Sequence, residues 1–278
     1  MATTGALKTE KVTETVGAEV LDVDVDRLLN DEEVPEAIVE TLEENGALLF
    51  RGLHIDDEAQ VAFCRRLGEV VAVPGHPIPE ITVVSLNPEN SLAQYLQGAF
   101  LWHLDGTMDA IPSKASVMTA HATAESGGDT EFASTYAAYD DLSADERERY
   151  ADLRVVHTFE ATQRRIYPDP TPVQLADWDT RPPRTHPLVW EHLSRRRSLV
   201  IGATASHVDG MDREEGGALL DHLLARATAP GRVFRHSWSV GDTVIWDNRG
   251  VIHRACLYDS GSPREMHRTT LVGEEPIK

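Results

Sequence analysis

Apolar residues recur at helical spacing in two segments near the start of the chain. In segment 31–45 they are Val34, Ile38 and Leu42, and the pattern stops where Gly46 follows Asn45. This spacing predicts a helix that buries one face. Segment 57–67 repeats the pattern and ends at a glycine. Its apolar positions are Ala59, Ala62, Phe63 and Leu67.

Beyond residue 81 the apolar residues form short runs, many of them β-branched, separated by Gly, Pro, Asn and Asp. The run 47–50 already has this character. The later runs are 81–85, 115–122, 155–159, 198–201, 233–238, 243–246, 251–255 and 267–272. Many short strands separated by turn residues predict a β-sandwich or a barrel.

Two further helices interrupt the predicted strands. One opens at Ser143, where Glu146 completes a capping box, and the other covers 213–227 with four leucines. Segment 163–187, rich in Pro, Arg and Asp, has no clear period and is expected to be a long loop, which is often a lid. The interpretation is a single domain, 1–278, mainly β with flanking helices.

Composition narrows the partners and the location. The chain has 26 Lys and Arg against 46 Asp and Glu, a net charge of −20. Such a surface repels phosphate backbones, so no nucleic-acid partner is expected. Two cysteines are too few for a disulfide framework. No apolar stretch has the length of a membrane span, and residues 1–10 do not resemble a signal peptide, so we expect a cytoplasmic protein without a membrane partner.

Candidate metal chemistry begins with the triplet His103-Leu104-Asp105. In an extended strand, residues two apart project to the same face, so the imidazole and the carboxylate would point together. Two histidines and one carboxylate on one face of an octahedron are the ligands of many iron(II) oxygenases. The triplet alone is weak evidence, because a His-Asp pair is also an ordinary hydrogen bond.

His253 is the best candidate for the third ligand. A turn, Asp247-Asn-Arg-Gly250, precedes it, and the residue then enters a new predicted strand. A rigid strand beside a tight turn positions a ligand well. The alternative is a buried histidine bonded to a backbone carbonyl.

Together these residues resemble the taurine dioxygenase and aryloxyalkanoate dioxygenase (TauD/TfdA) family of iron(II)- and 2-oxoglutarate-dependent enzymes. The family pattern is His-x-Asp, then a Thr or Ser, a distant His and an Arg shortly after it. The matching residues here are His103, Asp105, Thr130, His253 and Arg264. The resemblance runs from about residue 15 to 275 and departs mainly in 71–98 and 163–187. It implies a double-stranded β-helix, a jelly-roll core with helices outside.

The resemblance also implies a set of roles. His103, Asp105 and His253 would hold Fe(II), while 2-oxoglutarate would act as co-substrate and O2 as oxidant. Arg264 offers a planar fork for the far carboxylate of 2-oxoglutarate, and Thr130 offers a hydroxyl. The expected reaction is C–H hydroxylation of a small molecule with release of succinate and CO2.

Two residues carry expectations about the substrate. Arg268 stands four residues after Arg264, so in a strand both would lie on one face. Relatives use an arginine here to bind a sulfonate or carboxylate, which predicts an anionic substrate: a carboxylate, sulfonate or sulfate ester. A structural ion pair is the alternative. His76, before Pro77, resembles a substrate-contacting histidine of the sulfonate enzymes, although the preceding loop differs.

Two alternative functions belong to other classes of protein. A non-catalytic jelly-roll protein could use the same residues to bind a metal or ligand, but it would have no need for Arg264 and Thr130. A zinc hydrolase could use two histidines and a carboxylate, but no general base is evident. Oligomeric state stays open, although relatives often form dimers or tetramers, so a homo-oligomer is one expectation.

Overall fold

The computed structural model describes residues 7–74, 76–87, 89–90, 93 and 96–278. Its largest sheet has seven strands in the order β1-β2-β3-β13-β5-β15-β4. All neighbours are antiparallel except β2 and β3. The strands are β1 Thr9–Lys11, β2 Ala18–Val20, β3 Ala47–Phe50, β4 Thr82–Val84, β5 Ala115–Ala122, β13 Thr243–Asp247 and β15 Glu265–Thr270.

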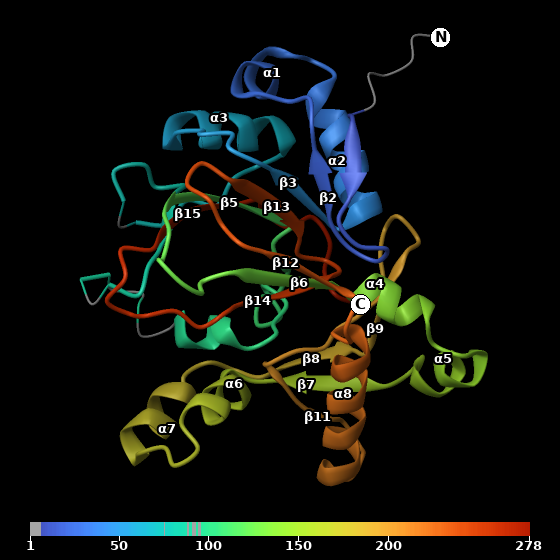
Figure 1. Ribbon diagram of the computed structural model, residues 1–278. Helices are drawn as coiled ribbons and strands as arrows, with labels where there is room; N and C mark the ends of the chain where they lie inside the picture. The colour runs from blue at the N-terminus through green and yellow to red at the C-terminus, as the bar shows by residue number, and fades with distance from the viewer. Residues whose placement is uncertain (1–6, 75, 88, 91–92, 94–95) are drawn as a thin grey trace.

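A three-stranded antiparallel sheet, β12-β6-β14, forms the second layer of the core (Figure 1). Its strands are β6 Thr130–Ser134, β12 Val233–His236 and β14 Val251–Ala255. Apolar side chains of both sheets, among them Met118, Phe132 and Val244, share one buried cluster. Two facing antiparallel sheets with such a shared core are a β-sandwich arrangement, and the space between them can hold a site.

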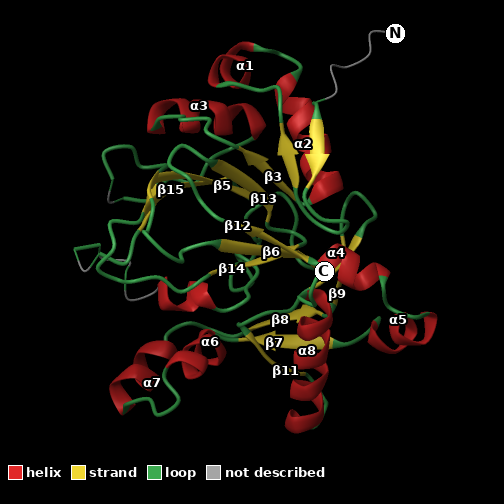
Figure 2. Cartoon of the chain, viewed as in Figure 1, coloured by secondary structure: helices red, strands yellow, loops and turns green. Residues whose placement is uncertain are grey.

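Helices cover the outer side of the large sheet, as Figure 2 shows. They are α1 Val25–Asn30, α2 Val34–Asn45 and α3 Asp57–Leu67. Apolar residues of α2 and α3, such as Ile38 and Phe63, pack in one cluster with Leu48 and Ile245 of the sheet. Burying this face stabilises both layers, at roughly 25 cal/mol per Å² of apolar surface.

The rest of the chain packs beyond the small sheet. It contains a three-stranded sheet, β11-β7-β8, a two-stranded sheet, β10-β9, and helix α8. The strands are β7 Arg154–His157, β8 Arg184–Pro187, β9 Val189–Glu191, β10 Arg197–Leu199 and β11 Ala205–Val208. The helices are η1 Leu96–Phe100, α4 Thr135–Asp140, α5 Ala144–Tyr150, α6 Phe159–Ile166, α7 Pro172–Trp178 and α8 Arg213–Ala227. Among the described residues, no helix has the length and apolar character needed to cross a membrane.

Most predicted elements are confirmed, several of them at the predicted residues. The helices 57–67 and 213–227 and the strands 115–122 and 251–255 have the expected bounds. The capping box between Ser143 and Glu146 is present at the start of α5.

The expectation of a long loop over 163–187 is wrong. Helix α6 reaches Ile166, and α7 and β8 fill most of the remainder. The physical reason is helix capping: the hydroxyls of Thr158 and Thr171 accept hydrogen bonds from the first turns of α6 and α7, and Gln174 completes a capping box with Thr171.

Buried neutral histidines make the stability of the fold sensitive to acid. Burial, together with a smaller effect of the neighbouring His186, lowers the pKa of His157 to about 3. In the unfolded chain this pKa is about 6.5. The unfolded chain therefore binds the proton first, and stability present above pH 6.5 is lost as the pH falls toward 3. Between pH 7.5 and 5.5, His157 alone should lower the free energy of unfolding by about 1.4 kcal/mol.

Urea unfolding of the metal-free chain at these two pH values measures the loss. The His157→Gln variant should show a difference between the two pH values that is smaller by about 1.4 kcal/mol. An unchanged difference in that variant would assign the acid sensitivity to other groups.

Candidate active site

Two histidines from distant parts of the chain meet through a backbone bridge. His253 lies in β14, and its N–H donates to the carbonyl of His103 at 2.9 Å, while the N–H of His103 donates back at 3.1 Å. This pairing brings the two imidazole centroids to 4.2 Å. The expected strand around His103 is reduced to this single bridge, because the chain turns directly after it.

Asp105 lies in that turn and faces both rings. Its Oδ1 is 3.7 Å from Nε2 of His103, and its Oδ2 is 3.8 Å from Nε2 of His253. One ligand atom from each of the three residues lies within 4.8 Å of the others. Gly106 permits the turn, because its φ is +81° and a Cβ there would lie 2.7 Å from Pro112. The turn and the backbone bridge therefore bring the three side chains together, and the alternation of side chains along a strand does not.

The electrostatics hold these groups in the protonation states that bind metal ions. Burial by itself raises the pKa of Asp105, but Arg268 and the two histidines outweigh it, and the pKa falls to about 2. Burial, together with a smaller effect of His103, lowers the pKa of His253 to about 3. At neutral pH the group offers one carboxylate and a neutral His253 imidazole.

The donor set fits iron(II). Two imidazoles and one carboxylate on one side leave further coordination positions free. His103 is also oriented from behind, because its Nδ1 lies 2.8 Å from the carbonyl of Leu101. With the proton on Nδ1 donated to that carbonyl, Nε2 is left to face the metal.

A cavity of about 260 Å³ opens beside the two histidines, between the two sheets. Its wall is mostly apolar, but Thr130, Arg264 and Arg268 also reach it. The lining includes Thr82, Val84, Leu96, Ala99, Met118, Trp246 and Ala255. A neighbouring hollow of about 420 Å³ includes Asp105 and shares Thr82 and Arg268 with this cavity. The volume suits a small organic ligand.

Arg264 is a buried cation at one end of the cavity. It precedes β15 and is 3% exposed, yet among the described residues it forms no ion pair with a carboxylate. Its Nε donates to the carbonyl of Gly128 at 3.1 Å, and its guanidinium lies 4.8 Å from the Tyr258 ring centroid. Burial lowers its pKa. The acidic charge that acts on it, Asp129, is itself paired with Arg235 at 2.6 Å. A buried guanidinium without a direct ion pair is costly unless a ligand supplies the anion.

Two neighbours fix the donors at that end of the cavity. Gly128 leaves room for Arg264, since a Cβ at Gly128 would lie 2.9 Å from the arginine Cδ. Trp238, which the sequence interpretation did not include, donates from Nε1 to the hydroxyl oxygen of Thr130 at 2.9 Å. The hydroxyl proton of Thr130 is thereby directed to another acceptor. No sequence motif marks this contact, which spans 108 residues.

Arg268 lies in β15 and lines the same cavity as Arg264, so the expected shared location is observed. Its Nη1 donates to Oδ2 of Asp105 at 3.3 Å. Its Nε is buried and has no hydrogen-bond partner among the described residues. One edge of the guanidinium therefore pairs with the carboxylate of the metal group, while the Nε donor is buried without an acceptor among the described residues.

His76 lies apart from these residues. Its Nε2 is 3.8 Å from Oδ2 of Asp57 on α3, and its ring packs edge-on against His267. It does not line the cavity that contains His103 and Arg268. Substrate contact by His76 stays a prediction that this placement does not favour.

The comparisons with known proteins agree with this geometry. A family described as "Taurine catabolism dioxygenase TauD, TfdA family" matches residues 8–270. The alpha-ketoglutarate-dependent 2,4-dichlorophenoxyacetate dioxygenase of Cupriavidus pinatubonensis is 36% identical over 277 residues, covering 94% of this chain and 96% of that protein. The alpha-ketoglutarate-dependent sulfate ester dioxygenase of Pseudomonas putida is 33% identical over 269 residues, covering 94% and 88%.

Solved structures extend the likeness to three dimensions. The crystal structure of AAD-2 in complex with Mn(II) and N-oxalylglycine superposes with a TM-score of 0.82 at 28% identity, covering 98% of this chain and all of that one. This confirms the double-stranded β-helix expected from the sequence. The chain therefore belongs to the TauD/TfdA dioxygenase family and is an oxidoreductase.

Proposed function

We propose that this dioxygenase binds Fe(II) through His103, Asp105 and His253 and uses 2-oxoglutarate and O2 to hydroxylate a C–H bond of a small anionic substrate. One observation carries the assignment of the co-substrate. Arg264 is buried without a carboxylate partner among the described residues, in the same cavity as the metal group. The far carboxylate of 2-oxoglutarate supplies the missing anion.

The chain's own residues perform positioning and electrostatic tasks. Iron(II) with 2-oxoglutarate, when bound, supplies oxidation of the substrate by O2, with succinate and CO2 as the other products. Arg264 and Thr130 hold the far carboxylate and so set where the reactive end of 2-oxoglutarate meets the metal group. The apolar walls, with Met118 and Trp246, exclude water from that end.

Arg268 supports an anionic substrate. Its guanidinium lies between Asp105 and the open hollow, and its Nε donor is unused among the described residues. A carboxylate, sulfonate or sulfate ester bound there would be held close to the metal group, while its organic part contacts the apolar wall. The relatives named above act on an aryloxyalkanoate and on sulfate esters, which have this combination of one anionic and one apolar end.

Succinate release tests the proposal. Protein supplied with Fe(II), ascorbate and 2-oxoglutarate should release succinate with at least one member of a panel of aryloxy acids, sulfate esters and alkyl sulfonates. Arg268→Met should raise the KM for that substrate about 10-fold or more, because it removes a charged hydrogen bond. Its KM for 2-oxoglutarate should change much less. Absence of succinate across the panel would contradict the activity.

Trp238 should act as a positioning residue for Thr130. Removing its hydrogen bond in Trp238→Phe costs about 1 kcal/mol, so the KM for 2-oxoglutarate should rise about 5-fold with little change in kcat. Trp190→Phe, in β9 and outside the cavity lining, is the matched control and should leave that KM unchanged. A lowered kcat with an unaltered KM would mean that Trp238 does not act through Thr130.

The two other readings have distinct outcomes. A non-catalytic jelly-roll binding protein would bind 2-oxoglutarate without consuming O2, and a zinc hydrolase would turn over its substrate without O2.

We also propose that residues 1–278 form a single domain with a lid around 163–187. Support for the lid comes from α6, which packs on η1, whose Leu96 and Ala99 line the cavity. Cytoplasmic location and assembly into a dimer or tetramer stay predictions.

A further inference from the structure

A second group of metal-binding side chains lies on the other face of the large sheet. Asp57, His121 and His267 each bring one ligand atom within 4.8 Å of the others. His267 directly precedes Arg268 in β15, so the two side chains project from opposite faces of the sheet. Arg268 lines the cavity, whereas His267 faces α3. This group is therefore separated from the dioxygenase site by the sheet itself.

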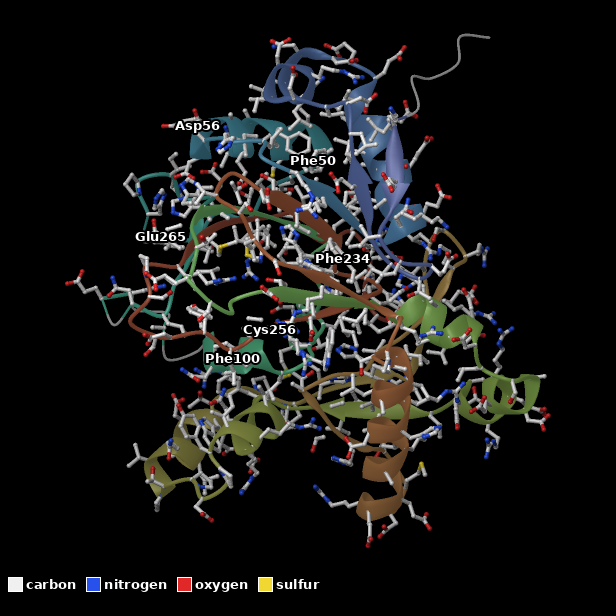
Figure 3. The ribbon with its side chains drawn as sticks, viewed as in Figure 1. Phe50, Asp56, Phe100, Phe234, Cys256 and Glu265 are labelled. Atoms are coloured by element: carbon white, nitrogen blue, oxygen red, sulfur yellow. The ribbon has the colours of Figure 1, made fainter. Side chains whose placement is uncertain are left out.

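The sequence folds so that these residues meet at one end of the contact between α3 and the sheet. Asp57 is the first residue of α3, and Gln60 lies one turn further along the same side. Gln60 accepts a hydrogen bond from Thr119 of β5 and donates one to Thr269 of β15. His121 and His267 each lie two residues from one of those threonines and share their face of the sheet. Figure 3 labels Asp56 and Glu265, the neighbours of this group at the starts of α3 and β15.

Contacts within the group are close. Nδ1 of His267 lies 2.7 Å from Oδ1 of Asp57, and Nε2 of His121 lies 3.5 Å from the same oxygen. The His121 and His267 rings stack with centroids 3.7 Å apart. Burial lowers the pKa of His121, and His267 adds to the effect.

A fourth ligand is available in His76. Its Nε2 is 3.8 Å from Oδ2 of Asp57. Its Nδ1 is 3.1 Å from both the N–H and the carbonyl oxygen of Ile78. In the tautomer that donates from Nδ1 to the carbonyl, Nε2 is free to coordinate, whereas the N–H of Ile78 bonds to Nδ1 in the other tautomer. Imidazole and carboxylate are both zinc ligands, and three imidazoles with one carboxylate would supply the four ligands of a tetrahedral site. Both groups bring three ligand atoms within 4.8 Å of one another, and the iron group differs in lying beside the cavity.

We propose that Asp57, His121 and His267, with His76 as the fourth ligand, form a second metal site that binds zinc or a similar divalent transition metal ion. The side chains are 9% to 31% exposed, so an ion can reach them from solvent. The net charge of −20 raises the local concentration of cations. Binding would tie α3, β5, β15 and the segment around His76 together, and so favour the folded state.

Zinc titration of a chain without the iron group tests the site. Asp105→Ala provides that background, so the result does not depend on the proposed dioxygenase activity. The metal-free Asp105→Ala chain, titrated with Zn2+ against a chromophoric chelator, should bind one equivalent. Adding His121→Gln or His267→Gln should weaken that binding at least about 100-fold, which corresponds to the loss of one ligand. His222 is an exposed histidine of α8, and adding His222→Gln is the matched control, which should leave zinc binding unchanged.

Thermal unfolding provides an independent measurement. Zn2+ should raise the Tm of Asp105→Ala in a concentration-dependent way and should leave the Tm of Asp105→Ala/His121→Gln unchanged. His121 is the most exposed ligand, so its substitution should preserve the fold, which circular dichroism checks. The proposal is overturned if Asp105→Ala binds no zinc, or if the His121→Gln and His267→Gln chains bind it as tightly as their background.

Discussion

Replacing Arg264 with methionine should weaken 2-oxoglutarate binding at least about 100-fold while the stability of the ligand-free chain changes little. Two charge-assisted hydrogen bonds to the far carboxylate contribute about 3 kcal/mol together, which corresponds to that factor. In the ligand-free chain the buried guanidinium has no carboxylate partner among the described residues. Its removal relieves a desolvation cost that offsets the lost hydrogen bond to Gly128 and the contact with Tyr258.

Calorimetric titration with 2-oxoglutarate under anaerobic conditions, with Fe(II) present, measures the first effect. Urea unfolding without metal or co-substrate measures the second, and we expect a free energy of unfolding within about 1 kcal/mol of the parent chain. Arg254→Met is the matched control, because Arg254 pairs with Glu131 at 2.7 Å and does not line the cavity. A dissociation constant that Arg264→Met leaves unaltered would remove Arg264 from the co-substrate site.

Elements with contiguous apolar residues and clear turn residues were predictable from the sequence. Strand Ala115–Ala122 and helix Arg213–Ala227 are examples. Strand Thr130–Ser134 was not predicted, because it is buried on all five positions and shows no alternation of polar and apolar residues. Helices α6 and α7 were missed although Thr171, Pro172 and Gln174 are a readable start signal, because the polar composition around them outweighed it.

The candidate site was predictable where a motif joins its residues, and not where only the fold does. The order and spacing of His103, Asp105, Thr130, His253 and Arg264 indicated a shared site. Trp238 belongs to that site only through its hydrogen bond to Thr130, at the end of the small sheet. No local sequence pattern marks this contact. The placement of His76 toward α3 depends on the path of a segment in which the chain departs from its relatives.

Asp105→Asn should abolish iron binding and turnover, whereas Asp109→Asn should preserve iron binding. The two substitutions remove the same charge from the same hollow, because Asp105 and Asp109 both line it. Only Asp105 lies within 3.8 Å of a nitrogen on each of the two histidines. A neutral amide is a poor ligand for iron(II). The substitution also removes the carboxylate that pairs with Arg268, which then faces the histidines without that partner.

Iron content after anaerobic reconstitution and the visible absorption of iron(II) with bound 2-oxoglutarate measure the effect on the site. Asp105→Asn should retain no stoichiometric iron and no such band, and its succinate release should fall to background. Asp109→Asn should keep both the iron and the band. The far-ultraviolet circular dichroism of both variants should match the parent chain, because Asp105 lies in a turn and not within the core sheets. Stoichiometric iron in Asp105→Asn would mean that the two histidines hold the metal with another partner. In that case the carboxylate of Asp105 would act through its ion pair with Arg268 and not as a metal ligand.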